Sequence, residues 1–134
     1  MMKQKSKRRR RGDIIWVDLG QHPHSHIQSG RRPCLIVNTN KSNADVYTVM
    51  PGTCKEAKDG FPVHVTIQPE EVKGRLEKQT IFMAEQLVTV DENQILLEVG
   101  RIDNNSDTMK RINQALIRQL QLVWEFEAGD SYQD

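Results

Sequence analysis

The chain contains few of the residues on which several classes of protein depend. Only two of its 134 residues are cysteines, Cys34 and Cys54, and their positions match no metal-ligand spacing. Two thiols do not make a disulfide framework, so we expect two reduced and mostly buried cysteines. No apolar run is long enough to cross a bilayer, which excludes a membrane span. No apolar stretch follows the basic amino terminus, so a cytoplasmic protein is expected rather than a secreted one.

The common catalytic signatures are also missing. The sequence has no phosphate-cradling glycine loop, no His-Glu-x-x-His metal motif and no nucleophile elbow. These absences exclude the commonest nucleotide-binding, zinc-protease and esterase classes. The length of 134 residues, with 37% hydrophobic and 28% charged residues, is typical of one soluble globular domain rather than of a multidomain enzyme or a disordered chain.

Positive charge is concentrated at the amino terminus. The net charge is +1, but residues 1–12 contain seven Lys or Arg and no acid, and the rest of the chain contains 12 bases and 18 acids. Such a run attracts phosphates through counterion release, although a solvated arm without a partner explains the charge equally well. We therefore divide the chain into a basic disordered arm over 1–10, a folded domain over 11–123 and an acidic tail over 124–134.

The pattern of apolar residues predicts a mainly β domain. Five expected strands share alternating or continuous apolar character and are bounded by turn residues: 13–19, 33–38, 46–50, 62–67 and 80–90. The third of these is expected to end at Pro51-Gly52, and the fifth, which is long, to bend near Glu85. A sixth strand or a helical turn is expected over 95–99.

A single helix is predicted at the carboxyl end, over 106–123. Apolar residues recur there every three or four positions, and Ser106 or Asp107 supplies a side chain suited to the helix start. The residues of the apolar stripe are Met109, Ile112, Leu116, Leu120 and Val123. Five or six short strands and one terminal helix favour a small, strongly bent antiparallel barrel capped by the helix.

Side chains suited to phosphate stand near two strand ends. Arg31 and Arg32 lie where a long loop, 21–32, enters the second strand, and Thr53 lies just past the third. If these strands pair antiparallel, Arg32 and Thr53 meet at one edge and face one phosphate together. The arginine offers a fork of donors and the threonine a neutral donor. A surface arginine and a turn threonine are the simpler interpretation.

Three histidines, His22, His24 and His26, alternate in the long loop. Pro23 and the lack of a flanking Cys or acid at a zinc spacing argue against a metal site, so we expect neither a metal nor a cofactor. A role for one of them as general base or acid is better supported, because the unperturbed pKa of histidine is near neutrality. His64 lies on an alternating strand and is expected to be structural.

Glu85 and Gln86 interrupt an apolar segment, where a carboxylate and an amide need partners. In one interpretation Gln86 reads the edge of a base while Glu85 anchors backbone or a loop. In the other, the two form a satisfied core pair, or a bulge turns both outward.

In their order and spacing these features resemble the MazF/PemK family, the toxin half of bacterial toxin–antitoxin pairs. The resemblance extends over about residues 10–122. Its matching segments are Arg11-Gly-Asp-Ile-Ile-Trp-Val-Asp-Leu19, Gln28-Ser-Gly-Arg-Arg-Pro33, Thr53 eight residues before Phe61, Pro62-Val-His-Val65, Ala84-Glu-Gln-Leu-Val-Thr-Val-Asp91 and Ala115-Leu116.

The resemblance implies an SH3-like antiparallel β-barrel with a C-terminal α-helix, and a homodimer that holds single-stranded RNA in a groove across its interface. It implies a metal-independent, sequence-specific endoribonuclease. The ribose 2′-hydroxyl attacks the adjacent phosphorus and leaves 2′,3′-cyclic phosphate and 5′-hydroxyl ends, which explains cleavage of RNA and not DNA. The implied partner is a small MazE-like antitoxin with a disordered acidic and apolar segment.

The resemblance also implies roles for residues of this chain. Arg32 matches a catalytic arginine that stabilises charge on the phosphoryl oxygens, and Thr53 matches a catalytic threonine that holds the phosphate. Contacts with RNA are expected from further residues in or beside the matching segments, namely Gln28, Gly30, Arg31, Phe61, Thr80, Glu85 and Gln86.

Two other functions stay open. CcdB toxins, which poison DNA gyrase, resemble this barrel and use an aromatic helix end, at a place comparable to Trp124 and Phe126 here. A non-catalytic RNA-binding barrel would bind phosphate through the same residues without turnover. Because Arg32 and Thr53 match the ribonuclease branch, both alternatives rank behind it.

The long loop over 21–32 departs from the pattern of the family and generates a prediction. Many relatives have a Ser-Glu-Gln triplet where this chain has His26, Ile27 and Gln28, and that glutamate has been proposed as general base. We expect His24 or His26 to replace it, so His24→Ala or His26→Ala removes a titration near neutral pH from the pH–rate profile of RNA cleavage. Profiles of both variants that superimpose on the parent profile would rule this out.

Overall fold

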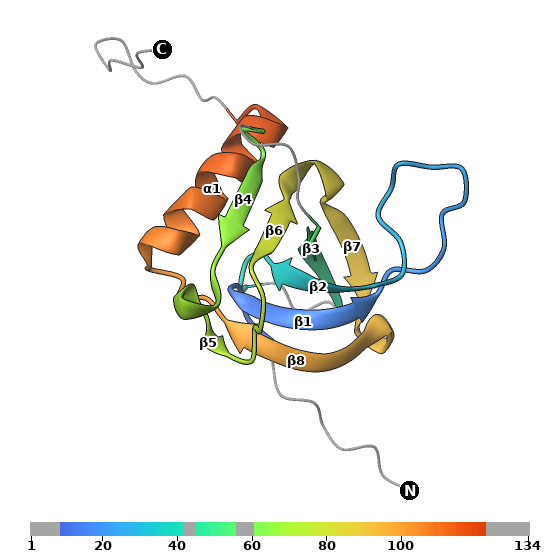
Figure 1. Cartoon of the computed structure of the whole chain (residues 1–134), viewed down its shortest axis with the longest axis horizontal. Helices are drawn as coiled ribbons and strands as arrows, with labels where there is room; N and C mark the ends of the chain where they lie inside the picture. The colour runs from blue at the N-terminus through green and yellow to red at the C-terminus, as the bar shows by residue number, and fades with distance from the viewer. Residues whose placement is uncertain (1–8, 42–44, 56–60, 123–134) are drawn as a thin grey trace, which may run out of the picture.

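The computed structural model describes residues 9–41, 45–55 and 61–122. Within them, short extended segments form eight strands, three single 3₁₀ turns and one α-helix (Figure 1). The strands are β1 (Asp13–Asp18), β2 (Arg31–Ile36), β3 (Val46–Thr53), β4 (His64–Ile67), β5 (Lys73–Gly74), β6 (Thr80–Met83), β7 (Val88–Asp91) and β8 (Ile95–Arg101). The 3₁₀ turns are η1 (Pro69–Glu71), η2 (Ala84–Gln86) and η3 (Glu92–Gln94), and the helix is α1 (Asp107–Leu120).

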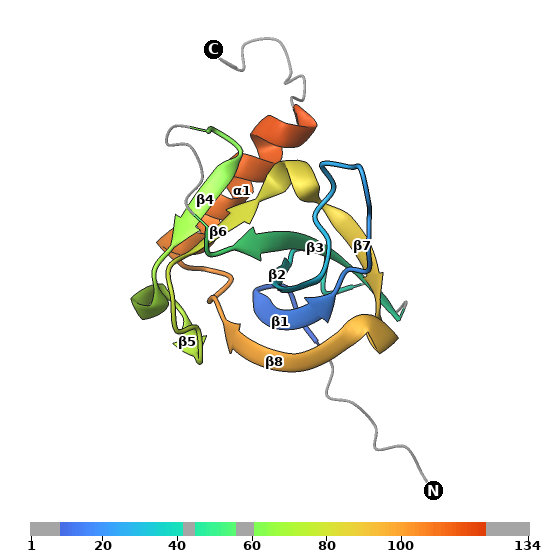
Figure 2. The same ribbon diagram turned by 45° about the vertical axis from the view of Figure 1, so that its right-hand side comes forward.

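The strands form one strongly curled antiparallel sheet in the order β4-β6-β3-β2-β1-β8-β5, with β7 pairing with β3 off this path. α1 lies against the β4 and β6 end of the sheet, whereas β1 and β8 wrap the other end (Figure 2). The mainly β fold expected from the sequence, a small SH3-like antiparallel barrel with a C-terminal helix, is confirmed. No helix in the described ranges is long and apolar enough to span a membrane.

Two apolar clusters fill the two sides of the curled sheet. Residues at odd and even positions of one strand face opposite sides, as Cys34 and Leu35 do in β2. Cys34 belongs to the cluster enclosed by β1, β2, β3 and β7, and Leu35 belongs to the cluster under α1. The buried residues of the helix are Thr108, Met109, Ile112, Ala115 and Leu116. The apolar face of the helix therefore completes the larger cluster.

α1 begins and ends for local reasons. The Ser106 side chain accepts a hydrogen bond from the Met109 N–H, which confirms the predicted N-cap. The helix ends at Leu120, earlier than predicted, because Gln121 adopts a left-handed conformation with φ of +51°. Leu120 is 48% exposed, so it does not continue the buried stripe, and Val123 lies outside the described residues.

Two predicted strand limits are wrong. β2 begins at Arg31 instead of Pro33, and β3 continues through Pro51 and Gly52 to Thr53. β3 pairs with β7 up to Val49 and with β6 from Gly52, so Pro51 falls between the two ladders, where a missing N–H is tolerated.

Gly52 is required at this point in β3. A Cβ there would lie 2.7 Å from Thr80 Cγ2 and 3.0 Å from the Phe82 ring. Glycine thus lets β3 pair closely with β6, and the turn residues that suggested a strand end instead allow a change of partner.

The other predicted elements exist with altered limits. The segment 80–90 consists of β6, η2 and β7, so the predicted bend at Glu85 is confirmed as a 3₁₀ turn. The segment 95–99 is part of β8, and the strand expected from residue 62 begins at His64.

The two cysteines differ. Cys34 is buried, and its burial raises the pKa of the thiol to about 12, although the nearby charge of Arg32 opposes the shift. Cys54 is exposed, so the prediction of two buried cysteines is wrong for it. Cys54 directly follows the last residue of β3, where burial along the strand has already decreased at Thr53.

The N-cap generates a stability prediction. Ser106→Ala removes the acceptor for the Met109 N–H and is expected to lower the free energy of unfolding by about 1 kcal/mol. The exposed Asn104, changed to alanine, is the control and should shift this free energy by no more than about 0.5 kcal/mol. Chemical denaturation measures both, and equal midpoints for Ser106→Ala and the parent would contradict the role of the cap.

Candidate active site

The pairing of β2 with β3 brings Arg32 and Thr53 to one edge of the sheet. Cys34 lies opposite Pro51 and Leu35 opposite Met50 in this antiparallel pair. Continuing the same register by two residues places Arg32 opposite Thr53, on the face shared by Cys34 and Pro51. The antiparallel pairing on which the predicted juxtaposition depended is therefore present.

The guanidinium of Arg32 is oriented by one hydrogen bond and otherwise available. Its Nε donates to the carbonyl oxygen of Ser29 at 2.9 Å, which ties the side chain to the end of the first loop. In the described part of the chain no other hydrogen bond or ion pair engages this side chain. Its two terminal nitrogens are left to donate to an oxyanion, the use for which a planar fork is suited.

Thr53 is half-buried at the end of β3. Its Oγ1 accepts a hydrogen bond from the Lys55 N–H at 3.2 Å, a local turn contact that orients the hydroxyl. The O–H proton has no acceptor among the described residues, so the hydroxyl keeps its ability to donate. One charged fork and one neutral donor thus stand at the same edge.

The first loop, residues 19–30, is closed at its neck and stands beside β7 (Figures 1 and 2). The Leu19 N–H donates to Gly30 O and the Gly30 N–H donates to Gly20 O, both at 2.8 Å. Gly20 and Gly30 have φ values of +80° and +78°, which glycine adopts without strain. Gly30, predicted to contact RNA, therefore has a structural reason to be glycine.

Gln86 holds the far side of this loop. Its Oε1 accepts from the Gln28 N–H and its Nε2 donates to the His26 carbonyl oxygen, both at 3.0 Å. The sequence suggested that Glu85 would anchor a loop and Gln86 would read a base. The anchoring contact belongs to Gln86 instead, because η2 turns this side chain toward the loop.

Glu85 points the other way, to His64 on β4. Its Oε2 lies 2.5 Å from His64 Nε2, and the Phe61 ring packs on the imidazole with centroids 4.7 Å apart. Glu85 Oε1 and His64 Nδ1 are buried without a hydrogen-bond partner in the described ranges. His64 was expected to be structural only. Its position opposite Met83 places it on the same sheet face as Ile81 and Thr53, a relation that only the register reveals.

A cavity of about 330 Å³ lies between the first loop and β7. Ile27 and Gln28 of the loop, Pro51 of β3, and Gln86 and Val88 are among the residues that line it. The buried Oε1 of Gln28 has no partner among the described residues. The cavity thus combines apolar walls with amide groups, as small-molecule and base sites do.

Thr80, one of the residues predicted to contact RNA, lies in the interior of the described structure. It is fully buried, and its hydroxyl donates to the Lys78 carbonyl oxygen at 3.0 Å. The methyl group lies close to Gly52, where β3 pairs with β6. Thr80 therefore packs against the end of β3.

The remaining predicted residues lie at the rim. Arg31 is exposed opposite Asp18 of β1, and His24 and His26 are exposed in the first loop. His22 makes a hydrogen bond of 3.1 Å between its Nε2 and Leu19 O. In the described ranges no group of three or more His, Cys, Asp or Glu is placed to hold a metal ion.

Comparison with known proteins relates the whole arrangement to one family. Residues 10–120 match the family described as the PemK-like, MazF-like toxin of type II toxin–antitoxin systems. The chain is 32% identical over 111 residues to the endoribonuclease MazF of Staphylococcus saprophyticus, a match that covers 80% of this chain and 87% of that protein.

Solved structures show the same fold at lower identity. MazF from Deinococcus radiodurans superimposes with a TM-score of 0.69 at 18% identity, covering 87% of this chain and all of that one. An endoribonuclease from a mycobacterial species, solved in complex with its cognate antitoxin, gives a TM-score of 0.68 at 22% identity, covering 88% of this chain and all of that one.

The clamp made by Gln86 generates a prediction. Gln86→Ala removes both bonds to the loop backbone and is expected to speed hydrogen exchange at the Gln28 amide about fivefold, because one hydrogen bond contributes about 1 kcal/mol. Exchange is followed by NMR, with Gln114→Ala on the exposed face of α1 as the matched control. An unchanged rate at Gln28 in Gln86→Ala would show that the clamp is dispensable.

Proposed function

The chain belongs to the PemK-like, MazF-like toxin family of type II toxin–antitoxin systems, and we propose that it is the endoribonuclease toxin of such a pair. The observation that carries the proposal is the β2–β3 register, which brings the Arg32 fork and the Thr53 hydroxyl to one edge. Both side chains retain donors that no described residue uses. The proposed substrate is single-stranded RNA, cut at specific sequences.

In the proposed reaction the RNA supplies its own nucleophile. The ribose 2′ oxygen bonds to the adjacent phosphorus as its proton leaves to a base, and the bond from phosphorus to the 5′ oxygen breaks. The 5′ oxygen takes up a proton, so the products have 2′,3′-cyclic phosphate and 5′-hydroxyl ends. DNA lacks the 2′-hydroxyl and is not cut.

Arg32 and Thr53 serve the charge that builds on the phosphoryl oxygens. The terminal nitrogens of Arg32 donate to these oxygens, and its positive charge supplies the stabilisation that a metal ion gives in other nucleases. The Thr53 hydroxyl adds a neutral hydrogen bond that holds the phosphate. We therefore propose a metal-independent mechanism.

The proton transfers are assigned to the first loop. His24 and His26 are exposed there, on a loop whose backbone Gln86 holds at residues 26 and 28. An exposed imidazole at such a position can serve as a general base or a general acid. Which of the two serves is decided by the pH–rate profiles.

The toxin role requires partners. We propose a homodimer with the RNA groove across its interface, and an antitoxin whose acidic and apolar segment occupies that groove. The mycobacterial relative forms a complex with its cognate antitoxin. In this chain Ile27 and Phe61 are 57% and 49% exposed beside the candidate site, where an apolar segment can pack. We place this pair in the cytoplasm, where its RNA substrate is found.

The direct test is cleavage of a long single-stranded RNA in EDTA, with cut sites and end groups mapped. The parent is expected to give discrete cuts with cyclic-phosphate ends, and Arg32→Ala to lower kcat by about 10²–10³-fold, as loss of an oxyanion donor does. Arg32→Lys should recover only part of the rate, because an ammonium lacks the fork. Thr53→Val should lower kcat less, since a neutral donor is lost.

Lys41→Ala is the control for the loss of one positive charge. Lys41 is exposed in the segment between β2 and β3, which follows the end of β2, whereas Arg32 is at the start of that strand. Its cleavage rate should equal that of the parent. No cutting by the parent would overturn the proposal. DNA breakage in the presence of gyrase would then separate a CcdB-like poison from a barrel that only binds RNA.

A further inference from the structure

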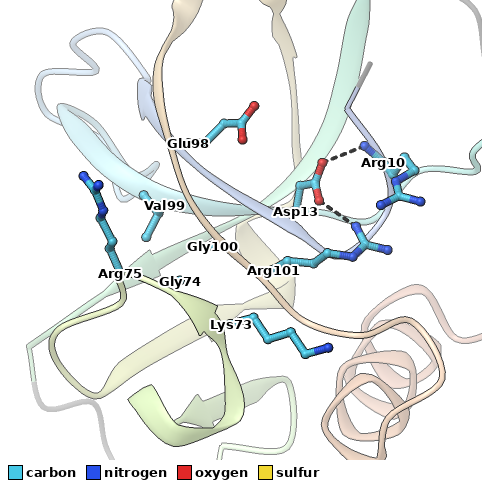
Figure 3. Close-up of a pocket in the computed structure, with 9 residues that line it drawn as sticks. All are labelled: Arg10, Asp13, Lys73, Gly74, Arg75, Glu98, Val99, Gly100 and Arg101. Carbon is cyan, nitrogen blue, oxygen red and sulfur yellow. Dashed lines mark hydrogen bonds and ion pairs between the residues drawn. The ribbon is translucent and has the colours of Figure 1, made fainter. Parts of the chain in front are cut away.

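A second cluster of cations lies away from Arg32, at the other end of β1. Asp13 at the start of β1 pairs with Arg101, and Asp18 at its end pairs with Arg31. The five residue steps between these ends span roughly 17 Å at about 3.4 Å each. A pocket of about 350 Å³ lies at the Asp13 end, and we name it the β5–β8 pocket (Figure 3). Its lining includes Arg10, Lys73, Arg75, Arg101, Asp13 and Glu98.

The carboxylates of the pocket are already paired. Asp13 accepts from Arg101 Nη1 at 2.6 Å and from the Arg10 N–H at 2.9 Å. Glu98 lies 3.5 Å from Arg9, which also binds Glu92 at 3.0 Å. Four cations thus line a pocket with two carboxylates, on a chain whose residues after position 12 are acidic overall.

Three of the four cationic side chains have no partner within the described ranges. Arg10, Lys73 and Arg75 form no side-chain hydrogen bond or ion pair with the described residues. Unpaired cations held around a concave surface give a positive potential that attracts anions. The pocket therefore differs from an ordinary surface ion-pair network.

Two glycines at the floor of the pocket let β5 and β8 approach each other closely. A Cβ on Gly74, whose φ is +130°, would lie 2.6 Å from Gly100 Cα, and a Cβ on Gly100 would lie 2.7 Å from Lys73 O. Figure 3 shows Arg75 on one side of this floor and Arg10 with Arg101 on the other. Cations spread over two sides suit a chain of phosphates better than a single ion.

The basic amino-terminal segment joins the body beside this pocket. Arg9 is anchored to Glu92 and Glu98, one residue before Arg10 of the pocket lining. The four cations Lys3, Lys5, Lys7 and Arg8 precede it directly in the sequence. The charge of the segment and that of the pocket are therefore continuous along the chain.

We propose that the β5–β8 pocket binds phosphates of the RNA backbone outside the cleavage edge, and so gives the protein sequence-independent affinity for long single-stranded RNA. The inference rests on the proposed function, since RNA is the long polyanion that this activity brings to the protein. Contacts to phosphates position the strand without reading bases. The pocket thus adds affinity, and the choice of sequence stays with the first loop and its neighbours.

The test removes two unpaired cations with Lys73→Gln and Arg75→Gln together, in the Arg32→Ala background that prevents cleavage. Lys41→Gln with Lys110→Gln, at exposed positions elsewhere, gives the matched change of charge. The affinity for a long single-stranded RNA is measured by filter binding over a range of salt. The slope of log K against log salt, where K is the association constant, is negative, and in the pocket variant it is expected to become shallower by about 1.4. The affinity at 0.1 M salt is expected to fall about tenfold.

Single-stranded DNA of the same sequence should lose the same factor, because phosphates and not 2′-hydroxyls are bound. Affinities of the pocket variant equal to those of the control would overturn the proposal. A loss of affinity for RNA but not for DNA would also overturn it, as would a loss confined to an acidic antitoxin peptide tested as a third ligand. Binding is measured without cleavage, so a parent that fails to cut RNA leaves this test intact. Unchanged thermal midpoints establish that both variants are folded.

Discussion

The pairing of β2 with β3 is the contact on which the rest of the structure depends. β3 binds β2 along one edge, and on the other edge it binds first β7 and then β6. The change of partner occurs at Pro51 and Gly52, where proline interrupts the ladder and glycine admits the close pairing with β6 beside Thr80. The register of β2 and β3, continued two residues beyond Cys34 and Pro51, directs Arg32 and Thr53 to one edge. One strand thus joins the two parts of the sheet and carries one side of the candidate catalytic edge.

The 3₁₀ turn η2 links this edge to the first loop. Gln86 at its end binds the loop backbone, while Glu85 beside it faces His64 of β4. A single turn therefore sends two neighbouring polar side chains in opposite directions. The loop depends on η2 for its position as well as on its own glycine neck, and Arg32 of the candidate catalytic edge binds its last turn through Ser29.

Sequence patterns predicted much of the fold because its local signals agree. The apolar period of α1 up to Leu116, the Ser106 cap and the bend at Glu85 are present as expected. The prediction failed where tertiary contacts outweigh a local signal. Pro51 and Gly52 indicated a strand end, yet β3 continues. Pro51 lies between the residues of β3 that pair with β7 and those that pair with β6, so no ladder hydrogen bond requires its missing N–H. Thr80 matched a groove position, yet it is buried beside Gly52, where β3 pairs with β6.

The sequence by itself determined the elements, the apolar faces, the basic amino terminus and the residue types that bind phosphate, since these depend on neighbours within a few positions of the chain. Only the tertiary structure decided which polar groups meet. Gln86 finds a loop 58 residues away, and Arg101 finds Asp13 across 88 residues. Such partners depend on strand register and on the curl of the sheet. Shifting a register by one residue turns a side chain to the opposite face, and no local pattern specifies that choice.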